Sequence, residues 1–272
     1  RKNNKGRINE YEKLSSRKID IEDNTLEIQI APGPQLGEQV IEVESLAKGY
    51  GGDPIFTGLT FSVPRGAVVG LVGPNGTGKT TLFKMIAGEE QPDSGTLKLG
   101  STVQLSYVDQ HRHDLGAENT VFQEITGGTE HIEVAGKTIN SRAYVGRFNF
   151  KGPDQQKKVG ELSGGERNRV HLAKLLRRGG NVLLLDEPTN DLDVTTLRNL
   201  ENAILDFNGC ALVISHDRFF LDRICTHLLV FEGNSKVRWF EGNFEEYQEK
   251  RKQELGGKEE NRRSKYKKLT IR

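Results

Sequence analysis

Short apolar runs, separated by glycine-rich and polar turns, dominate the chain from Val40 onward. Runs of this length are typical of β-strands. They predict strands over residues 40–46, 59–63, 67–72, 97–99, 103–108, 182–185 and 211–214. The last two runs alternate with helical patterns, which indicates a parallel sheet covered by helices. The pattern therefore predicts an α/β fold.

The regions outside these strands have other patterns. Residues from about 119 to 178 are predicted to be largely helical with few strong strands, and a further helix is expected over 244–255. Trp239 and Phe240 precede that helix, and we expect them to pack against it.

The start of the chain is more polar. Its first segment has the pattern of the end of a polar helix, which buries little by itself. Leu26, Ile28 and Ile30 alternate with polar residues, which predicts a strand. Prolines and glycines then predict a loop before Val40.

Composition narrows the class of protein. The chain has 272 residues, 34% of them hydrophobic and 31 of them glycine, which fits one large domain or two small ones and excludes wholesale disorder. No stretch approaches the ~18 apolar residues of a membrane span, and the first residues contain no apolar signal region. We therefore expect a cytoplasmic protein. The only methionine is Met85, so we also expect the chain to be a piece of a longer protein.

The charge is unevenly distributed although it sums to +1. Residues 1–18 carry seven Lys or Arg against two Glu, and residues 257–272 do the same, so each end has a net charge of +5 and the remainder −9. Basic ends of this kind are either solvated or bind the phosphates of a nucleic acid.

The first candidate for chemistry follows the predicted strand 67–72. It matches the P-loop pattern between a strand and a helix, and consists of Gly73, Pro74, Asn75, Gly76, Thr77, Gly78, Lys79 and Thr80. Glycines allow backbone N–H groups to surround phosphate oxygens, and the N-terminus of the following helix attracts negative charge. In such a loop Lys79 reaches the terminal phosphates and the Thr80 hydroxyl can bind Mg²⁺. The loop predicts a nucleotide site.

An acidic pair follows the apolar run 182–185. Asp186 emerges where a nucleotide-bound Mg²⁺ would lie, and Glu187 is placed to act on an attacking water. An exposed acidic pair that merely closes a strand is the alternative interpretation, and the P-loop argues against it.

Four more features occur in order around these motifs. Leu162-Ser163-Gly164-Gly165-Glu166 opens a predicted helix, and Ser163 precedes Asp186 by 23 residues. Gln110 follows the predicted strand 103–108, His216 follows 211–214, and Tyr50 lies upstream of the P-loop. Together with the P-loop and the acidic pair, this set resembles the motifs of the ATP-binding cassette (ABC) ATPases.

The resemblance implies a role for each motif. It implies that Tyr50 stacks on adenine, and that the P-loop from Gly73 to Thr80, with Thr81, binds the phosphates. It implies catalytic roles for Glu187, His216, Gln110 and Lys79, and a Mg²⁺ site made by Thr80, Gln110 and Asp186. It further implies that Ser163, Gly164, Gly165 and Glu166 cap the nucleotide of another cassette, so that a complete site needs two cassettes.

It also implies a domain organisation. An ABC-type nucleotide-binding domain would occupy 26–245, with a P-loop RecA-like core built on a parallel sheet, an antiparallel β subdomain and a helical signature subdomain over about 111–178. Residues 1–25 would be the end of an interdomain linker helix, and 246–272 a basic C-terminal extension.

Two segments narrow the resemblance. Residues 187–193 (EPTNDLD) and 215–222 (SHDRFFLD) resemble the F subfamily, soluble tandem-cassette proteins that act on ribosomes. This implies an ATPase that gates translation according to its nucleotide state, with ATP, a second cassette and a ribosome with its rRNA and tRNA as partners, and no membrane.

Two other classes of ABC ATPase are the alternatives. The ATPase subunit of a membrane transporter would dock on a membrane partner near Gln110, and the F-type segments count against it. A DNA repair or chromosome ATPase would carry an inserted coiled coil. Only 51 residues separate Gln110 from Leu162, and glycines interrupt them, so no long coiled coil fits.

Overall fold

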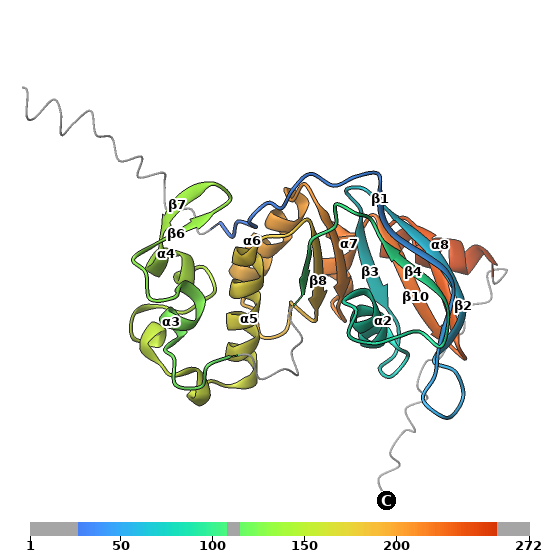
Figure 1. Ribbon diagram of the computed structural model, residues 1–272, viewed down its shortest axis with the longest axis horizontal. Helices are drawn as coiled ribbons and strands as arrows, with labels where there is room; N and C mark the ends of the chain where they lie inside the picture. Colours follow the sequence, from blue (N-terminus) through green and yellow to red (C-terminus); the bar gives the residue numbers. More distant parts are fainter. Residues whose placement is uncertain (1–26, 108–114, 255–272) are drawn as a thin grey trace, which may run out of the picture.

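A six-stranded sheet lies at the centre of the computed structural model, which describes residues 27–107 and 115–254 (Figure 1). Its strand order is β11-β10-β3-β9-β8-β5. The strands are β3 (Val68–Val72), β5 (Leu105–Tyr107), β8 (Val182–Asp186), β9 (Cys210–Ile214), β10 (His227–Gly233) and β11 (Lys236–Glu241). Neighbouring strands from β10 to β5 are parallel and β11 pairs antiparallel with β10. The predicted parallel sheet is confirmed.

A second, antiparallel sheet packs beside the first. It contains β1 (Gln39–Lys48), β2 (Phe56–Pro64) and β4 (Ser94–Leu99) in the order β2-β1-β4. Helix α2 (Lys79–Ile86) follows β3, and its buried apolar residues belong to the same hydrophobic cluster as the inner face of this sheet. The antiparallel β subdomain is therefore present.

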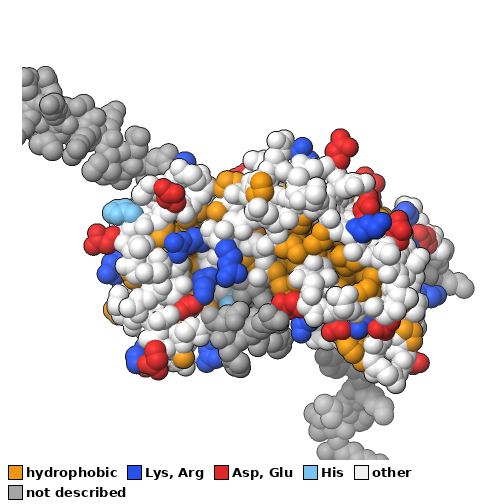
Figure 2. All heavy atoms as spheres, viewed as in Figure 1, with side chains coloured by type: hydrophobic (Ala, Val, Ile, Leu, Met, Phe, Trp, Pro, Cys, Tyr) orange, Lys and Arg blue, Asp and Glu red, His pale blue; other side chains and the backbone are white. Residues whose placement is uncertain are grey.

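Helices lie on the other side of the central sheet. They are α3 (Val121–Thr126), α4 (Ser141–Gly146), α5 (Gly164–Arg178), α6 (Val194–Leu205), α7 (Arg218–Ile224) and α8 (Phe244–Glu254), with 3₁₀ turns η1 (Gly152–Gln156) and η2 (Val159–Glu161). Helices α3 and α4 pack against each other, and α3 against α5, on the side of α5 away from the sheet (Figure 1). In the view of Figure 2, Lys and Arg side chains gather beside α5, and hydrophobic side chains gather nearer the centre of the molecule.

The alternation of side chains along the central strands creates two cores. Leu183 and Leu185 of β8 belong to the cluster that contains the helices, whereas Val182 and Leu184 belong to the cluster with α2 and the antiparallel sheet. Successive side chains of a strand point to opposite faces, so an uninterrupted apolar run is needed when both faces are covered. This explains why the central strands could be found from their apolar runs.

The largely helical region contains a hairpin that the sequence did not predict. Strand β6 (His131–Val134) pairs antiparallel with β7 (Lys137–Asn140). Ala135 and Gly136 connect them, both with positive φ, as a two-residue hairpin turn requires. Each strand has only four residues, two of them buried in β6 and none in β7, so the apolar signal was weak.

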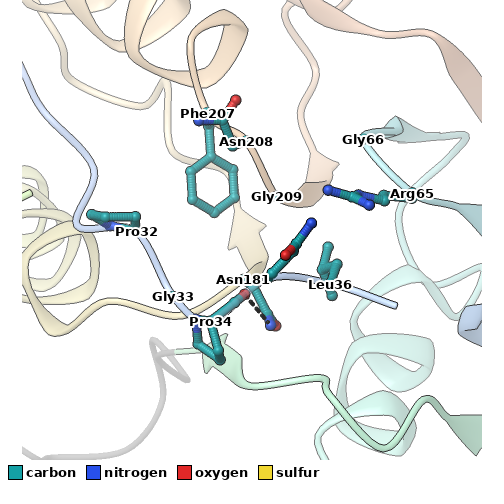
Figure 3. A pocket seen from close by; sticks show the side chains of 11 residues that line it. Pro32, Gly33, Pro34, Leu36, Arg65, Gly66, Asn181, Phe207, Asn208 and Gly209 are labelled. Carbon is teal, nitrogen blue, oxygen red and sulfur yellow. Dashed lines mark hydrogen bonds between the residues drawn. The ribbon is translucent and has the colours of Figure 1, made fainter. Parts of the chain in front are cut away.

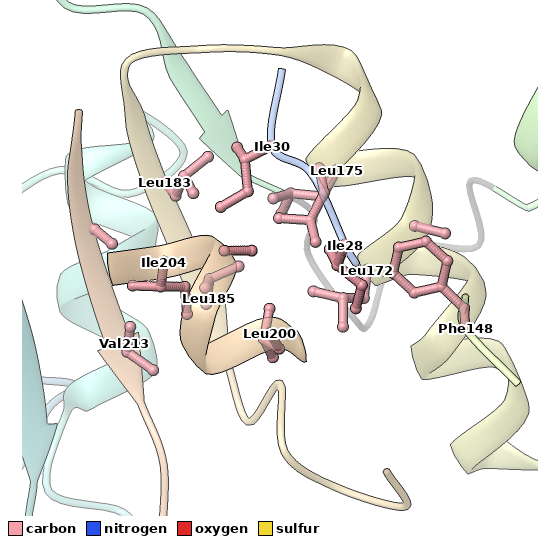
Figure 4. Packing of buried hydrophobic residues seen from close by; sticks show 14 of the residues in the cluster. Ile28, Ile30, Phe148, Leu172, Leu175, Leu183, Leu185, Leu200, Ile204 and Val213 are labelled. Carbon is pink, nitrogen blue, oxygen red and sulfur yellow. The ribbon is translucent and has the colours of Figure 1, made fainter. Parts of the chain in front are cut away.

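The predicted strand over 26–30 is wrong within the described residues. Leu26 lies outside them, and Ile28 and Ile30 are buried without belonging to a strand. They pack between α5 and β8 (Figure 4), and the Ala31 N–H donates to the Leu176 carbonyl at the end of α5, 3.0 Å away. The alternation of apolar and polar residues reflects the burial of one side of this segment. The segment does not continue as a strand, because Pro32 and Pro34 lack the N–H groups that pairing in a sheet needs.

The expectation for Trp239 is also wrong, while that for Phe240 is confirmed. Trp239 stacks on Phe61 of β2 and on His227, with ring centroids 5.5 and 5.0 Å away. Phe240 packs edge-on against Tyr247 of α8 at 5.5 Å. Both lie on β11, where neighbouring side chains face opposite sides, so they cannot share one partner.

One buried amide fastens the segment before β1 to the sheet. Asn181 accepts a hydrogen bond from the Gln104 N–H at 2.7 Å and donates to the carbonyls of Pro34 and Thr102 at 2.9 and 2.7 Å. Figure 3 shows Asn181 beside Pro34 in a hollow at the edge of the sheet where β8 and β9 begin. Two backbone segments, at Pro34 and at residues 102–104, are therefore joined by one side chain.

We expect Asn181→Leu to lower the free energy of unfolding by about 1 to 3 kcal/mol, because three part-buried backbone groups each lose their hydrogen bond to the buried Asn181 amide. Thermal or urea unfolding measures the loss. Asn208→Ala is the matched control: Asn208 lines the same hollow but is exposed, and we expect a change within about 0.5 kcal/mol. Equal stability of the Asn181→Leu variant and the parent would contradict this role.

A search of the described helices for one both long and apolar enough to cross a membrane found none.

Candidate functional site

The candidate residues follow the ends of three neighbouring strands at one edge of the central sheet. In the order β3-β9-β8, Leu71 is paired with Ile214, and Ile214 with Asp186. The P-loop follows β3, His216 follows β9, and Glu187 follows β8. Because parallel strands end at the same edge, these residues meet although they are far apart in sequence.

The P-loop has the predicted setting between a strand and a helix. It leads from β3 into α2, and Gly78 immediately before the helix has φ +101°. A Cβ there would collide with Ile55 and Phe56, so only glycine fits. Within the loop the Thr77 hydroxyl donates to the Pro74 carbonyl at 2.8 Å.

Lys79 lies inside this loop, 7% exposed. Its ammonium donates to the carbonyls of Gly73 and Pro74, 2.8 Å away in each case. Burial lowers the pKa of Lys79, and the nearby charges of Glu187 and Asp186 oppose this effect. The positive charge is thus held at the centre of the loop by carbonyl dipoles and carboxylates.

Thr80 and Asp186 form the candidate metal site. The Thr80 hydroxyl donates to Asp186 Oδ2 at 3.1 Å, so an alcohol and a carboxylate oxygen converge next to the P-loop. Such hard oxygen donors suit Mg²⁺, which keeps several waters and is completed by nucleotide phosphates. The residues fit the metal. Gln110, the third predicted ligand, lies outside the described residues.

Glu187 has a strained and shielded position. Its φ is +47°, a conformation that non-glycine residues rarely adopt and that occurs at functional sites. Glu187 Oε1 lies 3.4 Å from His216 Nε2, and the His216 N–H donates to Oε2 at 3.3 Å. Burial raises the pKa of Glu187, while His216 acts in the opposite direction. A carboxylate with a raised pKa is suited to accept a proton.

The signature segment opens α5. Ser163 is the N-cap: its hydroxyl accepts from the Glu166 N–H at 3.3 Å, and Glu166 Oε2 accepts from the Ser163 N–H at 2.9 Å. This reciprocal capping box explains the Ser-x-x-Glu spacing. A Cβ on Gly165 would collide with the side chain of Asp191, whereas one on Gly164 would meet open space.

Helix α5 is also tied to the loop that carries Glu187. Asn168 Nδ2 donates to the Glu187 carbonyl at 3.3 Å, and Arg169 Nη1 donates to the Asp191 carbonyl at 3.0 Å. Sequence reasoning missed both residues. They follow Ser163 by five and six positions without forming a motif, and only the tertiary structure brings them to this loop.

A pair of hydroxyls joins the loops after β8 and β9. Thr189 Oγ1 and Ser215 Oγ are 3.0 Å apart, and Ser215 Oγ accepts from the Asp217 N–H at 3.1 Å. Both residues lie in segments that the sequence analysis singled out, but their pairing was not predicted.

Tyr50 lies two residues beyond the end of β1, the central strand of the antiparallel sheet, and is 60% exposed. The Lys48 ammonium lies 5.1 Å from the centre of its ring. The remaining predicted phosphate ligand, Thr81, is on the first turn of α2 and is half-buried.

Comparison with known proteins agrees with this arrangement. The family model described as ABC transporter matches residues 56–190. A solved structure of a metal-chelate type ABC transporter in an inward-facing conformation is similar in fold, with a TM-score of 0.56 at 22% identity over 75% of this chain and 84% of that one. The chain is an ABC-type nucleotide-binding domain.

Its relatives define the subfamily. The chain is 56% identical over 266 residues to the energy-dependent translational throttle protein EttA of Escherichia coli strain K12, covering 97% of the chain and 48% of that protein. EttA of Mycobacterium tuberculosis strain H37Rv is 55% identical, covering 93% and 46%. The ATP-binding protein Uup of Haemophilus influenzae is 38% identical, covering 90% and 38%. The chain belongs to the ABC-F subfamily and spans about half the length, or less, of these relatives.

Proposed function

We propose that this chain binds and hydrolyses ATP with Mg²⁺, and that it is one cassette of a ribosome-associated translation factor whose nucleotide state gates translation. The observation that carries the ATPase proposal is the convergence of Lys79, Asp186, Glu187 and His216 at the ends of three neighbouring strands. The translational role is supported by the name of its relatives, energy-dependent translational throttle protein.

The P-loop would hold the nucleotide phosphates. Its backbone N–H groups and the start of α2 favour negative charge, and Lys79 adds a buried positive charge beside them. Thr80 and Asp186 would hold Mg²⁺, whose charge would offset that of the nucleotide phosphates. Tyr50, with its exposed ring, would stack on the adenine.

Glu187 would accept the proton of the attacking water. Its burial favours the protonated carboxyl, so taking up a proton relieves the desolvation of the charge. His216 would orient Glu187 through its backbone N–H and its ring, both directed at the carboxylate. Gln110 remains a proposed participant in catalysis and Mg²⁺ binding.

The signature segment would act on a second cassette. Helices α2 and α5 lie on different sides of β8 in the view of Figure 1. The start of α5, at Ser163, Gly164, Gly165 and Glu166, would place a helix N-terminus against the terminal phosphate held by another P-loop. Hydrolysis would then need a pair of cassettes, formed with another part of a longer protein or with a second copy of this chain.

We further propose that the chain is the second of two cassettes. Residues 1–25 would end an interdomain linker, 26–245 would form the ATPase domain with its helical subdomain over about 111–178, and 246–272 would be a basic extension. The clusters of seven Lys or Arg at each end would contact ribosomal or transfer RNA.

Sedimentation with ribosomes tests the translational proposal. We expect the full-length protein with Glu187→Gln to co-sediment with ribosomes in ATP and to dissociate in ADP. Deleting residues 257–272 is expected to reduce the salt dependence of this binding, because fewer phosphate contacts release fewer counterions. Nucleotide-independent sedimentation would contradict gating, and an unchanged salt dependence would contradict RNA contacts by the extension.

A further inference from the structure

Lys48, at the end of β1, is a buried cation that none of the family motifs includes. It is 7% exposed, and its ammonium is surrounded by oxygens. It lies 2.7 Å from Glu90 Oε1 and donates to the Gln91 carbonyl at 2.8 Å and to Asp93 Oδ1 at 3.2 Å. An ammonium has three donors, so these oxygens saturate it and fix its position.

All three partners belong to the turn that connects α2 to β4. Asp93 also accepts from the Gly49 N–H at 2.7 Å. The segment immediately before Tyr50 is therefore fastened, through Lys48 and Gly49, to the turn that follows the P-loop helix.

The same cluster holds the aromatic ring. The Lys48 ammonium lies 5.1 Å from the centre of the Tyr50 ring, within the range of a cation–π contact. The pKa of Glu90 is lowered chiefly by its hydrogen bond from Lys48. The cation is thus fixed over one face of the ring, while Tyr50 remains 60% exposed.

We propose that Lys48 is a positioning residue that orients the Tyr50 ring for stacking on the adenine of ATP. The ammonium covers one face of the ring and leaves the other for the base. A ring ordered before binding loses less conformational entropy when the nucleotide arrives. This inference rests on the proposed function, since it concerns how the same site recognises the base.

The test compares a ligand with adenine and one without it. Binding of β,γ-imido-ATP and of tripolyphosphate, each with Mg²⁺, is measured by calorimetry on the protein and its Lys48→Met variant. We expect Lys48→Met to weaken the binding of β,γ-imido-ATP about two- to tenfold, which corresponds to the free energy of ordering one side chain. The affinity for tripolyphosphate should not change. Lys48→Arg, which keeps a cation that can lie over the ring, should restore part of the affinity.

Two controls make the comparison specific. Lys98→Met removes an exposed lysine of the neighbouring strand β4 and should change the binding of neither ligand. In a Tyr50→Ala background, Lys48→Met should have no further effect on β,γ-imido-ATP, because the ring through which it acts is absent.

The outcomes are distinguishable. If Lys48→Met weakened the binding of both ligands equally, Lys48 would act through the P-loop or the fold, and the inference would be overturned. Unchanged binding of both ligands would overturn it too. If Lys79→Met left the binding of both ligands unaltered, the proposed nucleotide site itself would fail, whatever Lys48 does.

Discussion

Glu187→Gln is expected to lower the ATPase turnover about a hundredfold or more while nucleotide binding is retained, since general-base catalysis contributes factors of this order. Gln keeps an oxygen that can accept the His216 N–H, so the loop after β8 should keep its shape. The variant should accumulate the nucleotide-bound, paired form of the cassette. Phosphate release measures turnover, and calorimetry with ATP measures binding.

The pKa of Glu187 sharpens this prediction. Burial raises it, so the ionised carboxylate destabilises the folded state at pH values above that pKa, and the effect is relieved as the pH falls through it. Gln removes the charge, so the Tm of the variant at neutral pH should be at least that of the parent. In the parent, a base must be ionised to act, so turnover should fall with decreasing pH at values above the ordinary glutamate pKa of about 4.3.

The matched control is Glu133→Gln on β6, an exposed carboxylate in the helical region, which should leave turnover unchanged. Unchanged turnover in the Glu187→Gln variant would show that the proton of the attacking water goes elsewhere. If turnover fell on the acid side with the pKa of a free glutamate, this would contradict the shielded position of Glu187.

Gly164→Asp is expected to lower the ATPase turnover about a hundredfold or more. It should not weaken the binding of nucleotide to the P-loop of the same chain. A Cβ on Gly164 meets open space, and its φ is not positive, so the substitution fits the fold. An acidic residue in the first turn even stabilises a helix. Its charge would, however, stand where the signature should meet the phosphate of the partner cassette.

Mixing two inactive variants tests the pairing directly. Gly164→Asp chains have an intact Glu187, and Glu187→Gln chains have an intact signature, so a mixed head-to-tail pair contains one complete site. We expect the mixture to be more active than the sum of its components, and the activity per molecule of the unmodified chain to rise with protein concentration. Gly164→Ala, which adds bulk without charge, should remain active. Additive activities together with concentration-independent turnover would contradict a shared site.

The parts of the fold that could be predicted are those with local causes. Strands β3, β8 and β9 are buried on both faces and therefore had to be continuous apolar runs, and the P-loop needed glycine at Gly78 because its φ is positive and its surroundings are full. Asp186 and Glu187 could be placed because they end such a run.

The remainder depends on partners distant in sequence. Ile28 and Ile30 alternate like a strand but bury against helix α5, and the short β6–β7 hairpin buries too little to be recognised. The contacts of Asn168 and Arg169 with the loop after β8 leave no pattern in the sequence, because a hydrogen bond to a backbone carbonyl does not constrain which residue supplies that carbonyl.

The attachment of Ala31 to the end of α5 means that the two ends of this helix move together with different partners. Its first turn carries the signature, and its Leu176 carbonyl, 13 residues after Ser163, holds the segment through which the chain enters the domain. At 1.5 Å per residue these points are about 20 Å apart on one rigid rod. A tilt of α5 that brings its signature end toward a partner's phosphate would swing the other end in the opposite direction. The segment at Glu27 would then be displaced by nucleotide capping without any contact of its own with ATP.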